Sequence, residues 1–343
     1  MTTEEDYTID DLPETTAVEV AHQTTGSSIS SSSSRGAGFY FNCAVLVVAV
    51  VGSAANGLVL YAMVAAKQHK KQILIFNQNA LDLVNCLFWF ITYAVALSNI
   101  YLSGTGGYWL CLTLLSNAVT DAAFFGSLIN LAAISIERYL NVVHHVWAKN
   151  KLRNWMIYSA MAFAWVTGIA CSAALVIPTT SVVNGLCHSG IFFLSPTGRK
   201  AYLIWDFLSF YVTNLFLFTY CYGRILVVIR RKARVMAAHS GQTSNTAQDQ
   251  SNKIQNSVIK TMILVSGMFS VTWAPSYIYP FLVDDNAALF HENAFFAVVF
   301  IAYLYVFINP FIYATKFTPV KRVLWGLITC KKNVPAAESG GTT

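Results

Sequence analysis

The sequence predicts an all-α integral membrane protein: a seven-transmembrane helix bundle with a short amphipathic eighth helix. Hydrophobic residues make up 55% of the 343-residue chain and charged residues only 11%, whereas soluble domains carry about 25% charged residues. Seven mostly apolar stretches also reach the roughly 20 residues that a helix needs to cross a bilayer. They lie at 39–66, 73–98, 108–137, 153–177, 201–229, 257–283 and 292–315. Because the linkers between them are short, we expect one membrane domain over 38–316.

The first 37 residues differ from the rest of the chain. They hold a serine run and seven acids, namely Glu4, Glu5, Asp6, Asp10, Asp11, Glu14 and Glu19. This composition cannot bury enough apolar surface to fold, so 1–37 is predicted to be a disordered tail. The tail contains no apolar stretch typical of a cleaved signal peptide. The first span is therefore expected to target the chain to the membrane.

The distribution of basic residues predicts the orientation. When alternate loops are assigned to opposite sides, all of the 22 Lys and Arg residues except Arg35, Arg199 and Lys200 fall on one side. Basic loops mark the cytoplasmic side of a membrane. We therefore expect the N-terminus outside, the C-terminus inside, and no nucleic-acid partner for the basic charge.

Ionisable residues inside the spans are functional candidates, because burying a charge in a bilayer is costly. Asp82 lies in the middle of span two, and Asp121 and Asp206 lie in the outer halves of spans three and five. Glu137 and Arg138 end span three. These few residues, together with the polar groups near them, are where the sequence places function.

Spans six and seven each contain a proline at a helical position, Pro275 in "FSVTWAPSYIYP" and Pro310 in "FINPFIY". A proline inside a helix removes a hydrogen bond and bends the helix, and in a membrane the freed carbonyl needs a polar partner. The sequence therefore predicts two bent helices, with Trp273 and Asn309 beside the bends.

One set of motif residues falls on each of several spans, in order along the chain. The sets are Asn56, Asp82, Glu137-Arg138-Tyr139, Trp165, Trp273-Ala274-Pro275 and Asn309-Pro310-Phe311-Ile312-Tyr313. Together they resemble the fingerprints of the rhodopsin-like (class A) G-protein-coupled receptors, over roughly 39–330. Any single motif recurs by chance, whereas all of them in register are specific.

The resemblance implies a switch that couples the receptor to a heterotrimeric G protein. It assigns this role to Glu137, Arg138, Tyr139, Tyr222, Trp273, Pro275, Asn309, Pro310 and Tyr313. Arg138 would pair with Glu137 at rest and contact the G protein after span six moves outward. Many relatives add an acid near the inner end of span six, where this chain has Gln255, so we expect appreciable basal signalling. Arrestin, a receptor kinase and membrane lipids would be further partners.

A polar core is implied by the same resemblance. Asp82, Ser127 and Asn309 match positions that hold an allosteric sodium ion in relatives, with Asn56 nearby, and hard oxygen donors suit such a cation. Tyr305 stands where relatives usually have Asn. Sodium coordination and a plain hydrogen-bond network therefore remain alternatives, and no other cofactor is expected.

A disulfide between Cys111 and Cys187 is also implied by the family. Cys111 lies 27 residues before Arg138, a longer spacing than the family pattern. The resemblance therefore requires either a bulge in span three or a remodelled outer end. No cysteine spacing in the chain predicts a metal site.

The ligand pocket is expected to include Thr120, Asp121, Asp206, Trp273, Tyr277 and Tyr303. Asp121 and Asp206 could receive a cationic group, or each could be satisfied by local hydroxyl groups. The acidic tail would steer a basic ligand, and Tyr7 among its acids resembles a tyrosine-sulfation site, although a tail that is merely solvated fits too. A short peptide is the first interpretation and a small amine the second.

Other functions are disfavoured. An opsin needs a Schiff-base lysine at the position of Tyr303, an enzyme needs a paired nucleophile and base, and a transporter would usually show an internal repeat. After span seven, 317–330 is predicted to be an amphipathic helix on the inner leaflet, ending at Cys330, a candidate palmitoylation site. Residues 331–343 would be a disordered cytoplasmic tail. The whole pattern is that of a plasma-membrane receptor.

Overall fold

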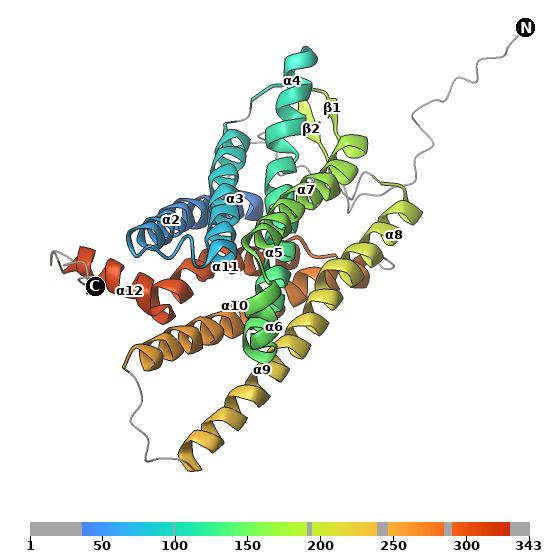
Figure 1. Cartoon of the computed structure of the whole chain (residues 1–343). Helices are drawn as coiled ribbons and strands as arrows, with labels where there is room; N and C mark the ends of the chain where they lie inside the picture. The colour runs from blue at the N-terminus through green and yellow to red at the C-terminus, as the bar shows by residue number, and fades with distance from the viewer. Residues whose placement is uncertain (1–35, 99, 191–193, 239–245, 285–289, 330–343) are drawn as a thin grey trace, which may run out of the picture.

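The computed structural model describes residues 36–98, 100–190, 194–238, 246–284 and 290–329. Within these ranges, seven helical segments are long and apolar enough to cross a membrane, which confirms the predicted fold class (Figure 1). They are α2 (Ala37–Ala65), α3 (Ile73–Leu97), the segment 104–143, α7 (Asn154–Thr179), the segment 196–238, α10 (Thr246–Asp284) and α11 (Glu292–Lys316). A short helix α6 (His145–Lys151) precedes α7, and α12 (Thr318–Ile328) follows α11. The acidic tail with Tyr7, and Cys330, lie outside the described residues.

The outer surface of the bundle differs from that of a water-soluble protein. Large apolar residues on the outer helix faces are exposed, for example Val166 at 66%, Phe216 at 74% and Val271 at 70%. Asp82 and Asn309, in contrast, are completely buried. Apolar surface that faces outward suits lipid, and polar groups that face inward find partners within the bundle.

The third span differs from the continuous helix predicted over 108–137. It begins with α4 (Gly104–Leu110), continues as the π-helical segment η3 (Cys111–Leu115), breaks, and resumes as α5 (Ala118–Val143). At the break, Asn117 adopts a left-handed backbone with φ of 62°. The wide π turn and the break together accommodate the additional residues between Cys111 and Arg138.

The fifth span is also irregular, although its only proline, Pro196, lies at the first helical position. It consists of α8 (Pro196–Asp206), the π-helical segment η5 (Phe207–Val212) and α9 (Thr213–Ala238). Two side chains donate to carbonyls in the irregular turn: Asn214 Nδ2 to Phe210 at 2.6 Å and Thr213 Oγ1 to Leu208 at 2.8 Å. These donors satisfy backbone groups that a regular helix would pair with itself. The span also starts earlier than predicted, so that the predicted loop residues Arg199 and Lys200 are helical.

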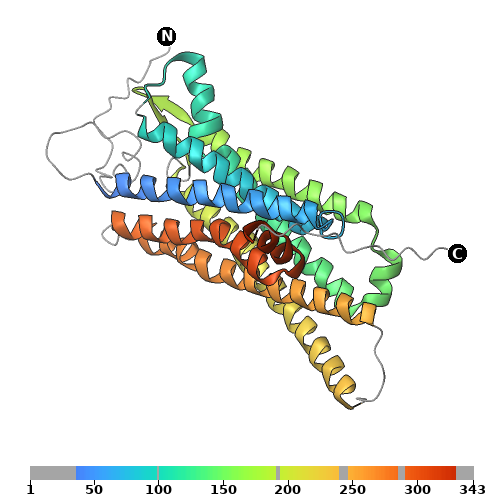
Figure 2. The same ribbon diagram turned by 90° about the vertical axis from the view of Figure 1, so that its left-hand side faces the viewer.

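A two-stranded hairpin lies at one end of the bundle (Figure 2). Its antiparallel strands are β1 (Ser181–Val183) and β2 (Leu186–His188), and Val182 pairs with Cys187. Asn184 and Gly185 connect them with φ values of 52° and 78°, the positive values that a tight Asn-Gly hairpin turn requires. The backbone N–H of Leu102 donates to the Gly185 carbonyl at 3.0 Å, which ties the hairpin to the segment that precedes α4.

Helices α5 and α7 approach each other closely at two glycines. A Cβ atom on Gly168 of α7 would collide with the Ala122 carbonyl and with the backbone of Gly126 in α5. A side chain at Gly168 would therefore force the two helices apart. Small residues at such a crossing let helix backbones approach within a membrane.

At the end opposite the hairpin, α12 lies across the bundle (Figure 2). Phe317 and Val320 are buried against the bundle, while Trp325 and Leu327 remain exposed. Ser257 of α10 donates a hydrogen bond to the Lys316 carbonyl at the end of α11, and the Thr318 hydroxyl lies 3.4 Å from the Ser257 hydroxyl. Ser257 thus connects the N-terminal part of α10 to the start of α12.

Candidate functional site

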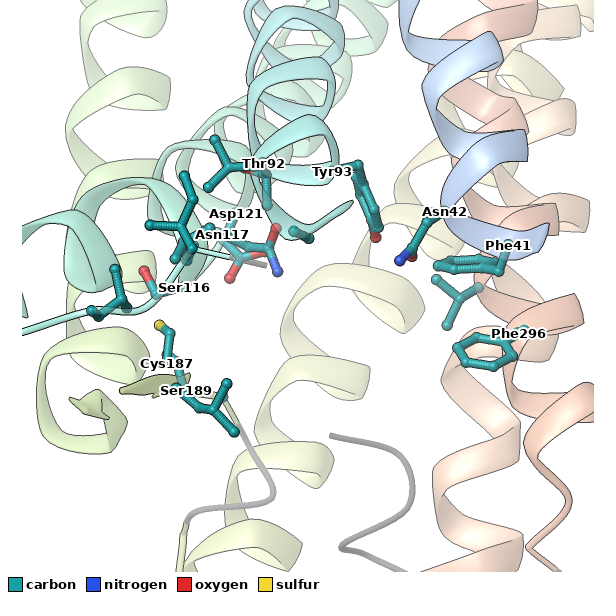
Figure 3. A pocket seen from close by; sticks show the side chains of 18 of the residues that line it. Phe41, Asn42, Thr92, Tyr93, Ser116, Asn117, Asp121, Cys187, Ser189 and Phe296 are labelled. Carbon is teal, nitrogen blue, oxygen red and sulfur yellow. The ribbon is translucent and has the colours of Figure 1, made fainter. Parts of the chain in front are cut away.

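A cavity of about 350 Å³ lies at the hairpin end of the bundle. Thr92 and Asp121 lie on one side of it, and Phe41 and Phe296 lie on the other (Figure 3). Strand β2 supplies a further wall that includes Cys187. A cavity of this size accommodates a small ligand or one inserted side chain of a larger ligand.

The lining combines aromatic rings with one carboxylate. Phe41 stacks on Phe296 with ring centroids 4.7 Å apart, and the hydroxyl oxygens of Tyr93 and Tyr303 are 3.4 Å apart. Asp121 is the acid among the described residues that line the cavity, and these residues include no Lys or Arg. Aromatic faces and a carboxylate both attract cations, so the chemistry of this cavity favours a positively charged group.

Of the six predicted pocket residues, Asp121 and Tyr303 line this cavity. The other four are Thr120, Asp206, Trp273 and Tyr277, none of which lines it. Thr120 is buried, and its hydroxyl donates to the Asn117 carbonyl at 2.8 Å, so this side chain supports the break in span three. Sequence reasoning missed Phe41, Tyr93 and Phe296, because aromatic residues in an apolar span carry no signal until the helix rotations are known.

Asp206 lies beside this cavity, close to Asp121. Asp206 lies close enough to interact electrostatically with Asp121, but it is not among the residues that line the cavity. Within the described part of the chain, neither Asp206 Oδ1 nor the buried hydroxyl of Tyr277 has a hydrogen-bond partner. The alternative in which local hydroxyl groups satisfy both carboxylates therefore does not hold for Oδ1 of Asp206.

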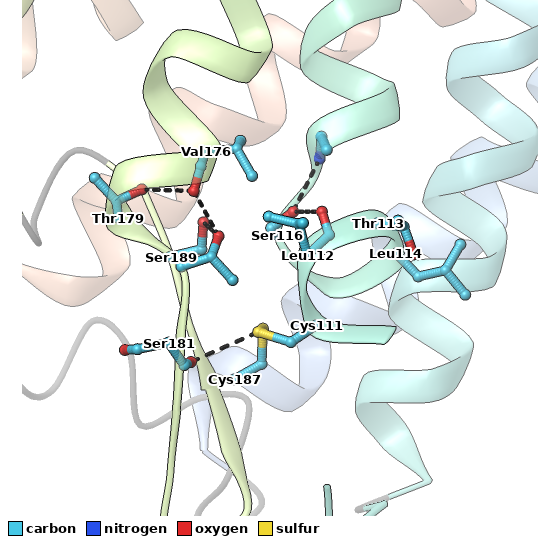
Figure 4. The surroundings of a disulfide bond; sticks show 12 residues. Cys111, Leu112, Thr113, Leu114, Ser116, Val176, Thr179, Ser181, Cys187 and Ser189 are labelled. Atoms are coloured by element: carbon cyan, nitrogen blue, oxygen red, sulfur yellow. Dashed lines mark hydrogen bonds between the residues drawn. A yellow bond between two sulfur atoms is a disulfide. The ribbon is translucent and has the colours of Figure 1, made fainter. Parts of the chain in front are cut away.

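The predicted disulfide between Cys111 and Cys187 is present, with Cα atoms 5.4 Å apart (Figure 4). It joins η3 to β2 and so attaches the hairpin to span three beside the cavity. The Thr180 hydroxyl donates to Ser189 Oγ at 3.0 Å, and this bond holds the segment after β2 against the end of α7. The wall that β2 contributes is therefore fixed at two points.

Aromatic contacts lead from the cavity toward the centre of the bundle. Phe124, three residues after Asp121 on α5, stacks on Trp273 of α10 with centroids 4.1 Å apart. Phe269, one turn along α10, meets Tyr305 of α11 edge to face at 5.6 Å. A displacement at the cavity can thus pass through ring contacts to the buried polar groups. These contacts lie next to Pro275, which is inside α10.

The predicted polar core is assembled around Asp82. Asn309 Nδ2 donates to Asp82 Oδ2 at 2.9 Å, and Ser127 Oγ donates to Oδ1 at 3.4 Å. Gln78 Nε2 also donates to Oδ1 at 3.4 Å. Asn56 instead donates to the Gly52 carbonyl of its own helix at 3.0 Å. Sequence reasoning missed Gln78, although its position four residues before Asp82 places it on the same helix face.

The other end of span three carries the predicted ion pair. Arg138 is buried, and its Nη2 donates to both carboxylate oxygens of Glu137 at 3.1 and 3.0 Å. The same nitrogen donates to Oε1 of Gln72, immediately before α3. Gln72 was missed because no periodicity marks a loop residue. The Gln255 side chain lies outside the described residues.

The predicted tyrosines Tyr222 and Tyr313 make no hydrogen bond to each other. Tyr222 shares a hydrogen bond of 3.0 Å with Ser135 of α5. Tyr313 lies three residues after Pro310 in α11. Its buried hydroxyl has no hydrogen-bond partner among the described residues. Tyr139 hydrogen-bonds to His144 at 3.1 Å. An arginine still paired with its neighbouring acid is the resting arrangement that the resemblance predicts.

Comparisons with known proteins agree with this geometry. The family model described as "7 transmembrane receptor (rhodopsin family)" matches residues 55–313. Rhodopsin of Petromyzon marinus is 25% identical over 86% of this chain and 82% of its own length, and somatostatin receptor type 3 of Mus musculus is 26% identical over 80% and 65%. The crystal structure of squid rhodopsin has the same fold, with a TM-score of 0.67, 16% identity, and coverage of 87% of this chain and 92% of that one. The chain therefore belongs to the rhodopsin family of seven-transmembrane receptors.

Proposed function

We propose that this receptor binds a short extracellular peptide through a basic group and passes the signal to a heterotrimeric G protein. The observation that carries the proposal is Asp121, a carboxylate in a cavity lined by aromatic rings. An ammonium or guanidinium group placed there would gain both an ion pair and contacts with ring faces. Because the cavity is largely apolar, a neutral or acidic ligand would leave Asp121 without a charge partner.

Size and charge support a peptide over a free amine. About 350 Å³ is enough for one basic side chain or terminal amine, and the rest of a peptide would contact the hairpin and the acidic tail. The relatives include somatostatin receptor type 3 and a tachykinin-like peptides receptor of Drosophila melanogaster. A small amine is the second candidate, because the enclosed carboxylate would bind it without further contacts.

In this proposal the hairpin end faces the outside of the plasma membrane and the Arg138 end faces the cytoplasm. The basic residues near the Arg138 end support this orientation. Ligand binding would shift the resting arrangement toward one in which Arg138 leaves Glu137 and contacts the G protein. Arrestin and a receptor kinase would then recognise the same active state.

The first experiment screens short basic peptides and small amines on the full-length receptor in cells, with a promiscuous G protein as the readout. For any ligand found, Asp121→Asn should reduce potency at least about tenfold, because the ligand cation loses its charge partner in a poorly hydrated site. The substitution keeps size and polarity and removes only the charge.

Asp206→Asn is the matched control, since it neutralises a nearby carboxylate that does not line the cavity. Its effect on potency should be clearly smaller than that of Asp121→Asn. Equal potency of the wild type and Asp121→Asn would contradict the proposed site. Activation by neutral ligands alone would contradict the proposed ligand class.

A further inference from the structure

A directed chain of hydrogen bonds crosses the middle of the bundle and ends at Asp82. Trp165 Nε1 of α7 donates to Asn77 Oδ1 of α3 at 3.0 Å, and Asn77 Nδ2 donates to Asn130 Oδ1 of α5 at 3.0 Å. Asn130 Nδ2 donates to Gln78 Oε1 at 2.8 Å. Gln78 Nε2 then donates to Asp82 Oδ1 at 3.4 Å. Each amide accepts through its oxygen and donates through its nitrogen, so the chain has a single direction.

Trp165 sets that direction, because an indole N–H can only donate a hydrogen bond. It requires the oxygen of Asn77 on its side, which turns the Asn77 nitrogen toward Asn130. Asn130 is fixed independently, because its Nδ2 also donates to the Leu74 carbonyl at 2.9 Å. With Asn130 donating, Gln78 must present its oxygen to Asn130 and its N–H groups to Asp82.

Burial makes the reverse orientation unfavourable. Gln78, Asp82 and Asn130 are completely buried, and Asn77 is nearly so, so no solvent is at hand to compensate a misplaced donor. A flipped Gln78 would set its nitrogen against the nitrogen of Asn130 and its oxygen against the carboxylate of Asp82. Unsatisfied buried polar groups of this kind are costly.

The direction of the chain decides what can bind beside Asp82. The family implies a sodium ion there, held by oxygen atoms of Asp82, Ser127 and Asn309. Gln78 Nε2 donates to the oxygens of both Ser127 and Asp82, and Ser127 uses its own hydrogen on Asp82. Asn309 also turns its nitrogen, not its oxygen, toward the carboxylate.

These residues do not fit a sodium ion, because a hard cation needs converging oxygen lone pairs. Here, N–H and O–H donors already converge on the Asp82 carboxylate. The position in α11 where relatives usually have Asn carries the fully buried Tyr305.

We propose that the amide of Gln78 takes the place of the sodium ion, so that the Asp82 site of this receptor binds no sodium. The amide nitrogen of Gln78 donates hydrogen bonds to Asp82 and Ser127. In relatives, these oxygens would instead contact the cation. The inference needs only the family membership and the described contacts, and it is independent of the ligand.

The test compares thermal unfolding of the purified full-length receptor in NaCl and in choline chloride at equal ionic strength. The melting temperature should be the same in both salts across the titration. A rise specific to sodium that disappears in Asp82→Asn would overturn the proposal. A rise that persists in Asp82→Asn arises elsewhere on the molecule and leaves the Asp82 site without sodium, as proposed.

Gln78→Glu provides the complementary arm, because it replaces the amide nitrogen by an oxygen in a side chain of the same shape. This variant should acquire a melting temperature that rises with sodium and not with choline. If it folds and remains insensitive to sodium, the N–H groups of Gln78 are not what excludes the ion and the proposal is wrong. If Gln78→Glu does not fold, the double variant Gln78→Leu with Tyr305→Asn replaces it in the test. This variant removes the amide and introduces the Asn that relatives usually have in α11. It is expected to gain the same response to sodium, and its failure to do so would count equally against the proposal.

Discussion

Asn117 holds the left-handed backbone that separates the π-helical segment η3 from α5. Its φ of 62° lies in a region that Asn and Gly tolerate and that β-branched residues avoid. The residue also lines the cavity, only four residues before Asp121. The direction in which Asp121 points therefore depends on the backbone of Asn117.

The residue predicts a simple pair of variants. Asn117→Gly should keep the melting temperature of the purified receptor near that of the wild type, because glycine adopts positive φ freely. Asn117→Val should lower the free energy of unfolding by about 1–2 kcal/mol, because a branched Cβ crowds the backbone in this conformation and valine lacks the polar group with which Asn compensates. Thermal unfolding in detergent measures both changes. Equal melting temperatures for the two variants would show that the left-handed backbone is not required.

At this scale, the sequence located the groups that belong to motifs and missed those that do not. Asp82, Ser127 and Asn309 were predicted to lie together, and they do, because motif register fixes their depth. Gln78 and Gln72 belong to no motif, yet each donates to or accepts from a motif residue. Their roles follow from helix rotation and rotamers, which periodicity in a wholly apolar span does not reveal.

Among the elements, α10 contacts α11 and α12 near its N-terminal end, at Ser257. Ser257 donates to the Lys316 carbonyl, which ends α11, while Arg138 bonds to α5 and to the residue before α3. The described contacts of the resting state therefore restrain α10 through a hydroxyl group rather than through the arginine. This restraint stands where many relatives use an acid, at a point two residues from Gln255.

Removing that hydroxyl should raise signalling in the absence of ligand. A hydrogen bond of this kind contributes about 0.5–1.5 kcal/mol, so Ser257→Ala is expected to shift the resting equilibrium roughly two- to tenfold toward the active state. Second-messenger output at matched surface expression measures the shift.

Thr315→Ala is the control for Ser257→Ala, because the Thr315 hydroxyl bonds only to carbonyls of its own helix. Its basal output should equal that of the wild type. Unchanged output from Ser257→Ala would mean that the contact with Lys316 does not hold α10.

The sequence predicts bends in α10 and α11 from Pro275 and Pro310, and both prolines do lie inside these helices. The π-helical turns η3 and η5 in spans three and five were not predictable, because neither turn contains a proline. In span five, Asn214 and Thr213 donate to backbone carbonyls of the π segment, and polar residues in an apolar run do not reveal in advance which carbonyl they will reach. The hairpin, in contrast, was predictable, because Asn-Gly at 184–185 is a clear signal for a two-residue turn.

At the scale of the whole molecule, the cavity and the Arg138–Glu137 pair lie at opposite ends of the bundle. Arg138→Ala should abolish activation of the G protein while leaving ligand binding measurable, because the residue lies at the opposite end from the cavity. Gln72→Ala removes only a partner of the resting arginine, so it should retain activation. Nucleotide exchange on a reconstituted G protein and radioligand binding separate the two effects, and exchange that survives Arg138→Ala would contradict the mechanism.

The close crossing of α5 and α7 has a mechanical consequence. With Gly168 against Gly126 and the Ala122 carbonyl, neither helix can rotate about its axis without pressing a side chain onto the other backbone. We therefore expect α5 and α7 to move as one rigid unit between the hairpin end and Arg138. Relative motion during signalling is then expected to fall to α10 and α11, which contain prolines inside their helices, with the α5–α7 pair as the fixed reference.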